Sequence, residues 1–246
     1  NEMKNRVLPY LDFTIRRNYI VKNDLMLLDI LTTNDWKRPI YLTSPSGIGG
    51  AINLDEYCHL EGMVYKFLPV KATDYIRGLG GVSSDTCYDV LVNRIKQWGN
   101  LNDPRVTVDR ESFRNTAIPR QNYMRVAQSM LNKGKNEEAE KALDLSLQYF
   151  PTSKIFPDKY MLSYVDLYYA AKATEKANNM ALQLANIFSQ DLNFYLSLEP
   201  KYSSQYEEEM SENAYLIQRL SQVASQNGQD STAKAIESMI NLKLSQ

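Results

Sequence analysis

The chain has 246 residues, which is enough for one large domain or two modest ones, each with its own hydrophobic core. Its 43% hydrophobic and 23% charged residues are typical of an ordinary soluble protein, and a net charge of −1 argues against a nucleic-acid partner. No apolar run approaches the ~18 residues of a membrane-spanning helix, and one histidine with two cysteines leaves most metal centres and catalytic triads incomplete. We therefore expect no metal, no cofactor and no catalytic residue in this chain.

Strand and helix signals alternate through the first half of the sequence. Residues 24–31 read Asp-Leu-Met-Leu-Leu-Asp-Ile-Leu, which is apolar nearly all round and predicts a buried helix. Residues 85–98 carry one apolar stripe at helical spacing and predict an amphipathic helix. Short apolar runs predict strands at 11–15, 40–43, 63–70 and 106–108. This alternation favours a small α/β domain over residues 1–114, with a mostly parallel sheet.

A glycine-rich segment, Ser44 to Gly50, follows the second predicted strand. Asn53 and Glu56 have the spacing of a helix cap and its reciprocal partner, so a short helix is expected there. The segment lacks the Lys-Ser/Thr pair of a phosphate-binding loop, and acidic residues open the helix after it, so we interpret it as a flexible loop. A second glycine cluster, at 78–81, predicts another mobile loop.

The two cysteines, Cys58 and Cys87, fall on two different predicted helices, the one after the glycine-rich segment and the amphipathic one. They are too few and too far apart for a zinc cluster. We expect two unpaired thiols, and a disulfide between them is the alternative if the compartment is oxidising.

The stretch from Gln121 to Pro151 predicts a helical hairpin. Apolar residues recur at helical spacing on both sides of Gly134, and Pro151 ends the second run because proline cannot continue the backbone ladder. Small residues at Ala127, Gly134 and Ala139 match the offsets of a tetratricopeptide repeat.

The Gly-x-x-x-x-Ala step of this hairpin returns at Gly228 and Ala233. A degenerate helix pair lies between the two copies, with Ala173 where the glycine is expected. We therefore predict that residues 115–246 form an all-α, tetratricopeptide-like domain of about three hairpins. Stacked hairpins bury a shared core and usually bind a partner.

Three separated runs of the chain resemble one protein family. They are LMLLDILTTNDWKRPIYLTS at 25–44, LDEYCHLEGMVYKFLPVK at 54–71 and YDVLVNRIKQWGNLNDPRVTVD at 88–109. Together they resemble the C-terminal region of large Bacteroidetes membrane proteins that carry a domain of unknown function and are similar to protein O-mannosyltransferases. The resemblance covers nearly all of residues 20–151.

The resemblance implies that this chain is the soluble tail of a glycosyltransferase-like membrane protein, on the periplasmic face of a bacterial membrane. The catalytic machinery of such proteins lies in the membrane half, which is the expected intramolecular partner, and no catalytic residue is carried over to the tail. The beginning of the chain, Asn-Glu-Met, is also what we expect of a piece of a longer protein.

Two surface motifs are candidates for binding. Trp36-Lys37-Arg38 joins an aromatic ring to two cations, which suits an anionic lipid or a sugar phosphate; the alternative is a helix-to-strand turn with solvated cations. Tyrosines recur every four residues in the second hairpin and suit stacking on sugars or peptides, or else packing between helices. These are Tyr160, Tyr164 and Tyr168.

Two functions of different classes follow. The first, which we favour, is a non-catalytic interaction module that binds a polypeptide acceptor or partner through its helical repeats. The second is a sugar-binding or small hydrolytic or transfer domain centred near His59, which lies beside Glu56 and Glu61 and could serve as a general base. A cleft that gathers His59, Glu61 and another polar group would favour the second function.

Overall fold

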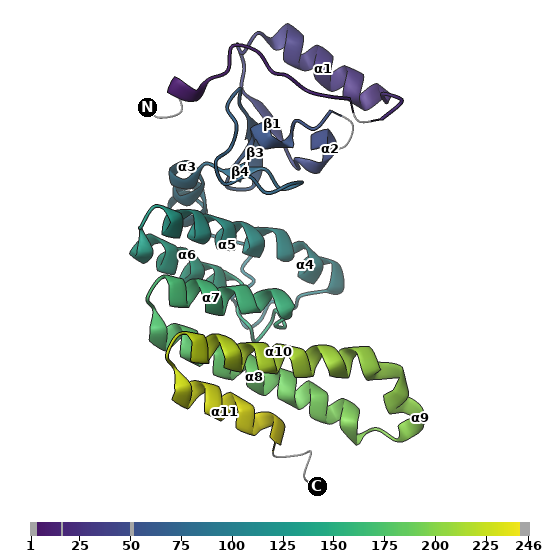
Figure 1. The fold of residues 1–246 in the computed structure, drawn as a ribbon, viewed down its shortest axis with the longest axis vertical. Coiled ribbons are helices and arrows are strands. Elements are labelled where there is room, and N and C mark those ends of the chain that lie inside the picture. Colours follow the sequence, from purple (N-terminus) through teal and green to yellow (C-terminus); the bar gives the residue numbers. More distant parts are fainter. Residues whose placement is uncertain (1–3, 16, 50–51, 242–246) are drawn as a thin grey trace. The chain divides into compact units, whose positions relative to one another are not determined.

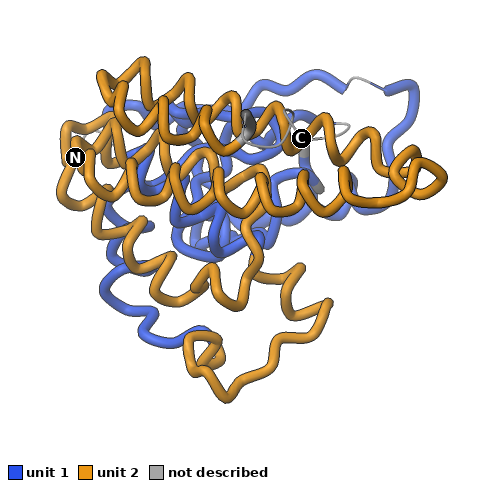
Figure 2. The backbone as a smooth tube through the Cα atoms, turned by 90° about the horizontal axis from the view of Figure 1, so that it is seen from below, with its two compact units in different colours: residues 1–98, 117–129 blue, residues 99–116, 130–246 orange. Residues whose placement is uncertain are grey.

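The computed structural model describes residues 4–15, 17–49 and 52–241 (Figure 1). The fold is mostly helical, at 61% of residues, with one small four-stranded sheet. The chain divides into two compact units that exchange segments along the sequence, as Figure 2 shows in blue and orange. Unit 1 comprises residues 1–98 and 117–129, and unit 2 comprises residues 99–116 and 130–246.

The sheet of unit 1 is mixed, so the prediction of a mostly parallel sheet is wrong. Its order is β1-β3-β2-β4; β3 runs antiparallel to both neighbours, and only β2 and β4 are parallel. The cause is the connection between β2 and β3, which has two residues and includes Gly62 at φ 82°. Such a turn can only join antiparallel strands. The strands are β1 (Ile40–Leu42), β2 (Cys58–Glu61), β3 (Val64–Phe67) and β4 (Gly81–Val82).

The strand register gives the sheet one apolar and one polar face. Paired residues Leu60 and Tyr65 lie on the core side and are 0% and 7% exposed. The opposite side carries Tyr41 and Lys66, which pair across β1 and β3, with His59 beside them. Such alternation is usual for a sheet with one buried face, but on β2 the second face is covered as well, since His59 is 3% exposed.

The sequence predicts the positions of the helices of unit 1 better than it predicts their burial. Helix α1 (Lys22–Asn34) confirms the predicted helix, but the prediction that it is buried is wrong: Leu25, Met26 and Ile30 are 55%, 54% and 49% exposed. The remaining elements are η1 (Lys4–Arg6), α2 (Ser46–Gly49), η2 (Asp55–Tyr57), α3 (Ser84–Tyr88) and a π-helical turn, Asp89–Arg94.

Several local predictions in unit 1 need correction. Residues 11–15 form no strand, and the helix expected after Asn53 is a single 3-10 turn, so Cys58 lies on β2 and not on a helix. The amphipathic helix ends at Arg94, short of residue 98. The glycine cluster at 78–81, predicted as a mobile loop, is held by Asp55 at Gly78 and enters β4 at Gly81, which pairs with β2.

Asp55 fixes the loop before β4 from a buried position. Its carboxylate accepts hydrogen bonds from the Tyr75 hydroxyl and the Gly78 amide, both at 2.8 Å. Asp55 is 1% exposed. Hydrogen bonds to a buried carboxylate are stronger than neutral ones, so this loop is held and not free.

Helix α5 (Ala117–Asn132) belongs to unit 1 from Ala117 to Ser129, and it contacts the sheet through one polar face. The Asn122 amide donates to the Gly62 carbonyl at 2.9 Å, and Arg125 donates to the Tyr65 hydroxyl and the Gly80 carbonyl, both at 2.9 Å. These contacts join residues at least 45 positions apart. The sheet therefore depends on a helix that the sequence assigned to the repeats.

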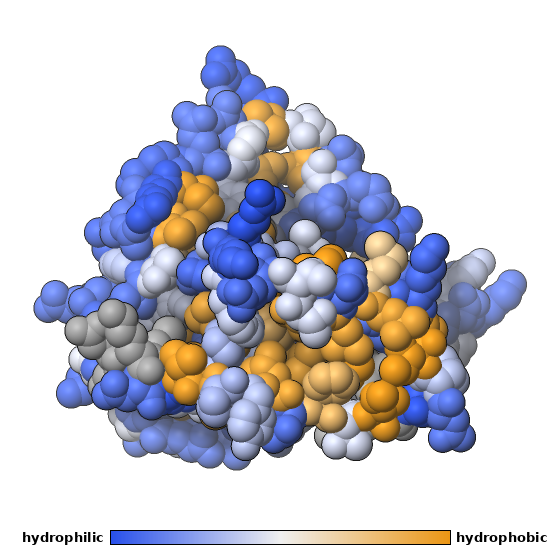
Figure 3. All heavy atoms as spheres, turned by 90° about the horizontal axis from the view of Figure 1, so that it is seen from above, coloured by the Kyte–Doolittle hydropathy of each residue, from blue (hydrophilic) through white to orange (hydrophobic). Residues whose placement is uncertain are grey.

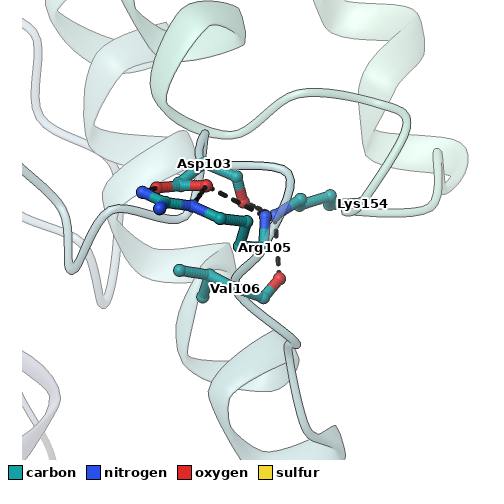
Figure 4. A network of polar contacts seen from close by, with 4 residues as sticks. All are labelled: Asp103, Arg105, Val106 and Lys154. Atoms are coloured by element: carbon teal, nitrogen blue, oxygen red, sulfur yellow. Dashed lines mark hydrogen bonds and ion pairs between the residues drawn. The ribbon is translucent and has the colours of Figure 1, made fainter.

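Unit 2 is built of helices and one ordered loop. No strand forms at 106–108, because the Val106 carbonyl accepts a hydrogen bond from Lys154 at 2.8 Å and the Asp103 carbonyl accepts another (Figure 4). Arg105 closes the same loop on the Asp103 carboxylate. The helices are α4 (Arg110–Asn115), α6 (Asn136–Tyr149), η4 (Lys159–Met161), α7 (Leu162–Ala170), α8 (Thr174–Ser197), α9 (Pro200–Ser203), η5 (Ser204–Tyr206), α10 (Glu207–Gln226) and α11 (Asp230–Asn241).

Three helix-to-helix turns have the same backbone geometry, which supports the predicted array of hairpins. One residue in each has positive φ: Gly134 at 72°, Lys172 at 64° and Gly228 at 73°. The amide that follows it donates back to the carbonyl five residues earlier, the hydrogen bond of a Schellman cap. These bonds run from Lys135 to Met130, from Ala173 to Tyr168 and from Gln229 to Ala224.

The shared turn corrects the register of the middle hairpin. Lys172, and not Ala173, occupies the glycine position. Five residues after each positive-φ residue stands a buried alanine: Ala139, Ala177 and Ala233, at 0%, 0% and 5% exposure. A small residue there lets two helices approach closely, which explains its recurrence.

Candidate functional site

The helical unit presents a polar stripe on α10. Tyr215, Gln218, Gln222 and Ser225 are exposed, at spacings of three and four residues, so they lie along one side of the helix. They border a groove of about 1040 Å³ that is lined by α10, with Glu237 of α11 at its side. Its base includes the buried side chain of Ile217.

The base of this groove is held by hydrogen bonds. The Ser221 hydroxyl contacts the Glu237 carboxylate at 2.8 Å and the Ala233 carbonyl at 3.3 Å, which joins α10 to α11. Beside the stripe, the Arg219 guanidinium donates to the side-chain carbonyl of Gln222 at 3.0 Å. The groove is therefore fixed at its base and carries adaptable amide and hydroxyl groups at its rim.

The segment before α7 lies beside the start of α10. Lys159 forms an ion pair with Glu212 at 2.9 Å. On α7, burial raises the pKa of Asp166, and the nearby Arg219 guanidinium of α10 opposes that rise. The surface shared by α7 and α10 thus carries charges of both signs next to the polar stripe.

The three predicted binding tyrosines divide into one surface residue and two core residues. Tyr160 is 65% exposed, whereas Tyr164 and Tyr168 are 0% and 2% exposed. The Tyr164 hydroxyl contacts the Ser146 hydroxyl at 2.6 Å, and the Tyr168 hydroxyl donates to Asp144 at 2.9 Å. A ligand on this surface can therefore contact Tyr160, while the other two hold α7 against α6.

Trp36, Lys37 and Arg38 line a groove of about 570 Å³ in unit 1. The Trp36 ring is parallel to Phe67, with ring centroids 6.1 Å apart and an interplanar angle of 3°, and it remains 47% exposed. Lys37 forms an exposed ion pair with Asp35 at 3.2 Å. Trp36 and Asp35 both have positive φ, so the turn between α1 and β1 is an unusual and specific one.

Residues near the chain start form the other wall of this groove. Val7, Leu8 and Pro9 lie against the end of β3, where the Leu8 amide donates to the Pro69 carbonyl at 2.8 Å. No local pattern in the sequence marks that wall, because its residues are about 60 positions from the strand that they contact.

His59 is a satisfied structural histidine. It is 3% exposed, and its Nε2 lies 2.8 Å from the Val70 carbonyl. Glu61 is engaged elsewhere: it accepts from the Tyr41 hydroxyl at 3.2 Å and lies 3.9 Å from Lys66. His59 lines neither groove.

Both cysteines are free and buried. Burial raises the pKa of each thiol to about 12, so neither is a thiolate at neutral pH. The Cys87 sulfur accepts a hydrogen bond from the Gly62 amide at 3.3 Å. The thiols are core groups of the sheet unit and not nucleophiles.

The sequence analysis did not predict the polar stripe on α10 as a binding surface, although its residue pattern is visible in the sequence. Tyr215, Gln218, Gln222 and Ser225 repeat at helical spacing on the side opposite the apolar residues of the third hairpin. Polar residues at such positions are normally attributed to solvent exposure. The hint was their chemistry: this stripe is uncharged, whereas charged residues usually dominate a solvated face.

Comparison with known proteins gives one match. Residues 1–86 are similar to the family described as TMEM260-associated domain 2. No curated protein and no solved structure matches the chain. The matched region is about a third of the chain and contains β1 to β4 and the Trp36 groove. Among the described residues, no helix is long and apolar enough to cross a membrane.

Proposed function

We propose that the chain is a non-catalytic interaction module of a membrane protein, and that its helical unit binds an extended segment of polypeptide. The observation that carries this proposal is the uncharged stripe on α10 beside the groove that α10 lines. The similarity of residues 1–86 to a TMEM260-associated domain supports the membrane-protein context.

The chemistry of the stripe suits main-chain recognition. A glutamine side chain carries two N–H donors and a carbonyl acceptor, the kinds of group that an extended peptide exposes along its backbone. The Gln222 carbonyl already accepts one hydrogen bond from Arg219. Gln218 and Gln222 lie one turn apart, and Tyr215 adds a flat apolar ring with a polar tip. Recognition through these groups does not require a particular side-chain sequence in the ligand.

The length of the stripe sets the length of the ligand. From Tyr215 to Ser225 the helix rises about 15 Å, at ~1.5 Å per residue. An extended chain advances ~3.3 Å per residue, so about four or five ligand residues fit along it. Tyr160 lies on the segment that Lys159 holds against α10, and it offers a further aromatic contact near one end.

In the parent protein, this module would hold an acceptor polypeptide. Because three runs of the sequence resemble protein O-mannosyltransferase-like proteins of Bacteroidetes, we propose that this acceptor is a substrate of the membrane half and is presented on the periplasmic face. The buried, satisfied state of His59 does not favour the alternative of a sugar-binding or hydrolytic site centred there.

Panning the full chain with a phage library of linear random peptides tests the function. Enriched peptides are then measured by fluorescence anisotropy against the wild type and against the double variant Gln218→Ala/Gln222→Ala. Loss of two hydrogen bonds predicts a roughly 10- to 30-fold weaker Kd, at ~1 kcal/mol each. The matched control is Gln190→Ala, an exposed glutamine of α8 outside the groove. Failure to enrich any peptide, or equal affinity of the double variant and wild type, refutes the proposal.

A further inference from the structure

Exposed apolar side chains are concentrated near the start of unit 1. Of the twenty large hydrophobic residues exposed in the described part of the chain, eleven lie within residues 7–41. That segment is about a seventh of the sequence, so the concentration is well above an even distribution of the scattered apolar residues found on any protein surface. Figure 3, viewed from the α1 end, shows orange apolar groups between blue hydrophilic ones.

The segment before α1 alternates apolar and aromatic side chains without forming a strand. The exposed fractions are 70% for Tyr10, 44% for Ile15, 60% for Tyr19 and 42% for Val21. Nothing in its own unit buries these groups. Leaving this many apolar side chains in water is unfavourable, and a surface that covers them would gain free energy from their burial.

The corner at Trp36 gives this surface a fixed anchor. Trp36 stacks on Phe67, and the hydrogen bond from Leu8 to Pro69 holds the chain start against the same strand end. The indole is thus presented outward from a rigid base, with Arg38 exposed next to it.

The charges in these two segments favour anions. Arg17, Lys22 and Arg38 are exposed, and the Arg17 guanidinium lies over the Tyr19 ring, 5.8 Å from its centroid. Asp12 is the exposed carboxylate within residues 7–22. Lys37 is neutralised by Asp35.

Helix α1 after Lys22 differs and is left out of the surface, as is Tyr41 of β1, so seven of the eleven exposed apolar residues remain on it. Asp29 is exposed among its apolar residues Leu25, Met26 and Ile30, and a carboxylate there would repel an anionic partner.

We propose that residues 7–15 and 17–22 and the corner formed by Trp36 and Arg38 lie on the headgroup region of an anionic lipid bilayer. Tyrosine and tryptophan are enriched at that depth, because their rings enter the apolar layer while their polar tips stay in water. Arginine and lysine beside them meet the negative surface potential of anionic lipids. An irregular segment of this composition fits a fluid surface, which requires no matching shape.

Lipid vesicles and the full chain test the proposal. Co-sedimentation is measured with vesicles of phosphatidylcholine alone and with vesicles in which about a third of the lipid is phosphatidylserine. We expect at least roughly tenfold stronger binding to the anionic vesicles, weakened by added salt because the cations are exposed. Trp98→Phe leaves Trp36 as the single tryptophan, and its emission should shift to the blue on binding.

Matched variants assign the binding to this surface. Arg17→Glu/Arg38→Glu should weaken binding to the anionic vesicles by at least about tenfold, and Tyr10→Ser/Tyr19→Ser should weaken binding to both kinds of vesicle. Lys234→Glu, an exposed cation of unit 2, should bind as the wild type does. The residues changed in these charge and tyrosine variants are exposed, so thermal melts should show the variants folded; Trp98 is half-buried against Tyr123, so the melt of Trp98→Phe is measured first.

Three outcomes would overturn the proposal. They are no binding to either vesicle, binding without a shift of Trp36 emission, and unchanged binding of the Arg17→Glu/Arg38→Glu variant. Binding to native membranes that protease treatment of those membranes abolishes, with none to pure lipid, would assign the surface to a protein partner instead.

Discussion

Substitutions at Gly134 should lower the stability of the protein through backbone strain and not through side-chain packing. Gly134 has φ 72°, and a Cβ built on it would meet no atom within 4 Å. Substitution therefore costs only the left-handed backbone energy, about 1–2 kcal/mol for an L-residue. The smaller conformational entropy of the unfolded variant offsets about 0.4–1 kcal/mol of this. Gly134→Ala should lose about 1 kcal/mol, Gly134→Val more, and Gly134→Asn less, because asparagine tolerates this region.

The third and second turns provide the matched controls. Gly228→Ala should behave as Gly134→Ala does, because Gly228 has φ 73° and the same open surroundings. Lys172 already carries the strain at φ 64°, so Lys172→Gly should have the opposite sign and stabilise by up to about 1 kcal/mol. For a chain of this size 1 kcal/mol corresponds to a Tm change of roughly 2–4 °C, measurable by circular dichroism and by urea midpoints. A Gly134→Val protein that melts like the wild type would show that this turn does not need a positive φ.

Four further predictions concern buried groups. Tyr164→Ala should lose about 3–5 kcal/mol in urea unfolding because it empties a core site, whereas Tyr160→Ala should change stability by less than about 0.5 kcal/mol; equal losses would contradict the burial described. Ellman titration of Cys58 and Cys87 should count no thiol in the native protein and two after denaturation without reductant, and a count of zero after denaturation would indicate a disulfide. Because burial raises both thiol pKa values to about 12 from 9, only the unfolded chain ionises between these values, so stability should fall as pH rises through that window; a flat profile would refute the assignment. Asn122→Ala should cost about 1–3 kcal/mol, because it strands the buried carbonyl that the amide now holds, and a smaller loss would mean that water replaces the amide.

The helical hairpins could be predicted from the sequence because the residues that specify each hairpin are close together in the chain. Gly134 and Gly228 mark turns, Pro151 ends a helix, and small residues recur at fixed offsets from the turns, so each hairpin is encoded within about thirty residues. The middle hairpin was read one residue out of register because Lys172 adopts a glycine conformation. A lysine in the sequence does not indicate a residue with positive φ, whereas a glycine does.

The sheet was harder to predict because its strands and the helix that supports them are distant in the sequence. Residues 58–61 are too short a run to distinguish helix from strand by periodicity, and the antiparallel order follows from the two-residue turn at Gly62. The exposure of α1 was also hidden. An apolar helix is predicted to be buried, and only the arrangement of the rest of unit 1 shows that nothing there covers it.

The candidate sites were likewise predicted only where their residues are close together in the sequence. The sequence identified the Trp36 corner as a possible binding motif, but not the wall that Leu8 adds from the distant chain start. It also identified a tyrosine repeat, but could not separate exposed Tyr160 from buried Tyr164, since each is one turn from the next. Neighbouring helices decide which side of a short helix faces water.

The polar face of α5 has a consequence for the order in which the chain acquires its structure. Asn122 and Arg125 close hydrogen bonds to Gly62, Tyr65 and Gly80, over sequence separations of 45 to 60 residues. Contacts of such high order form slowly, whereas helical hairpins form quickly from neighbouring residues. During synthesis the ribosome must release residue 125 before the strands made long before it receive their last partners. We therefore expect the sheet to lack its hydrogen bonds to Asn122 and Arg125 until α5 has been synthesised.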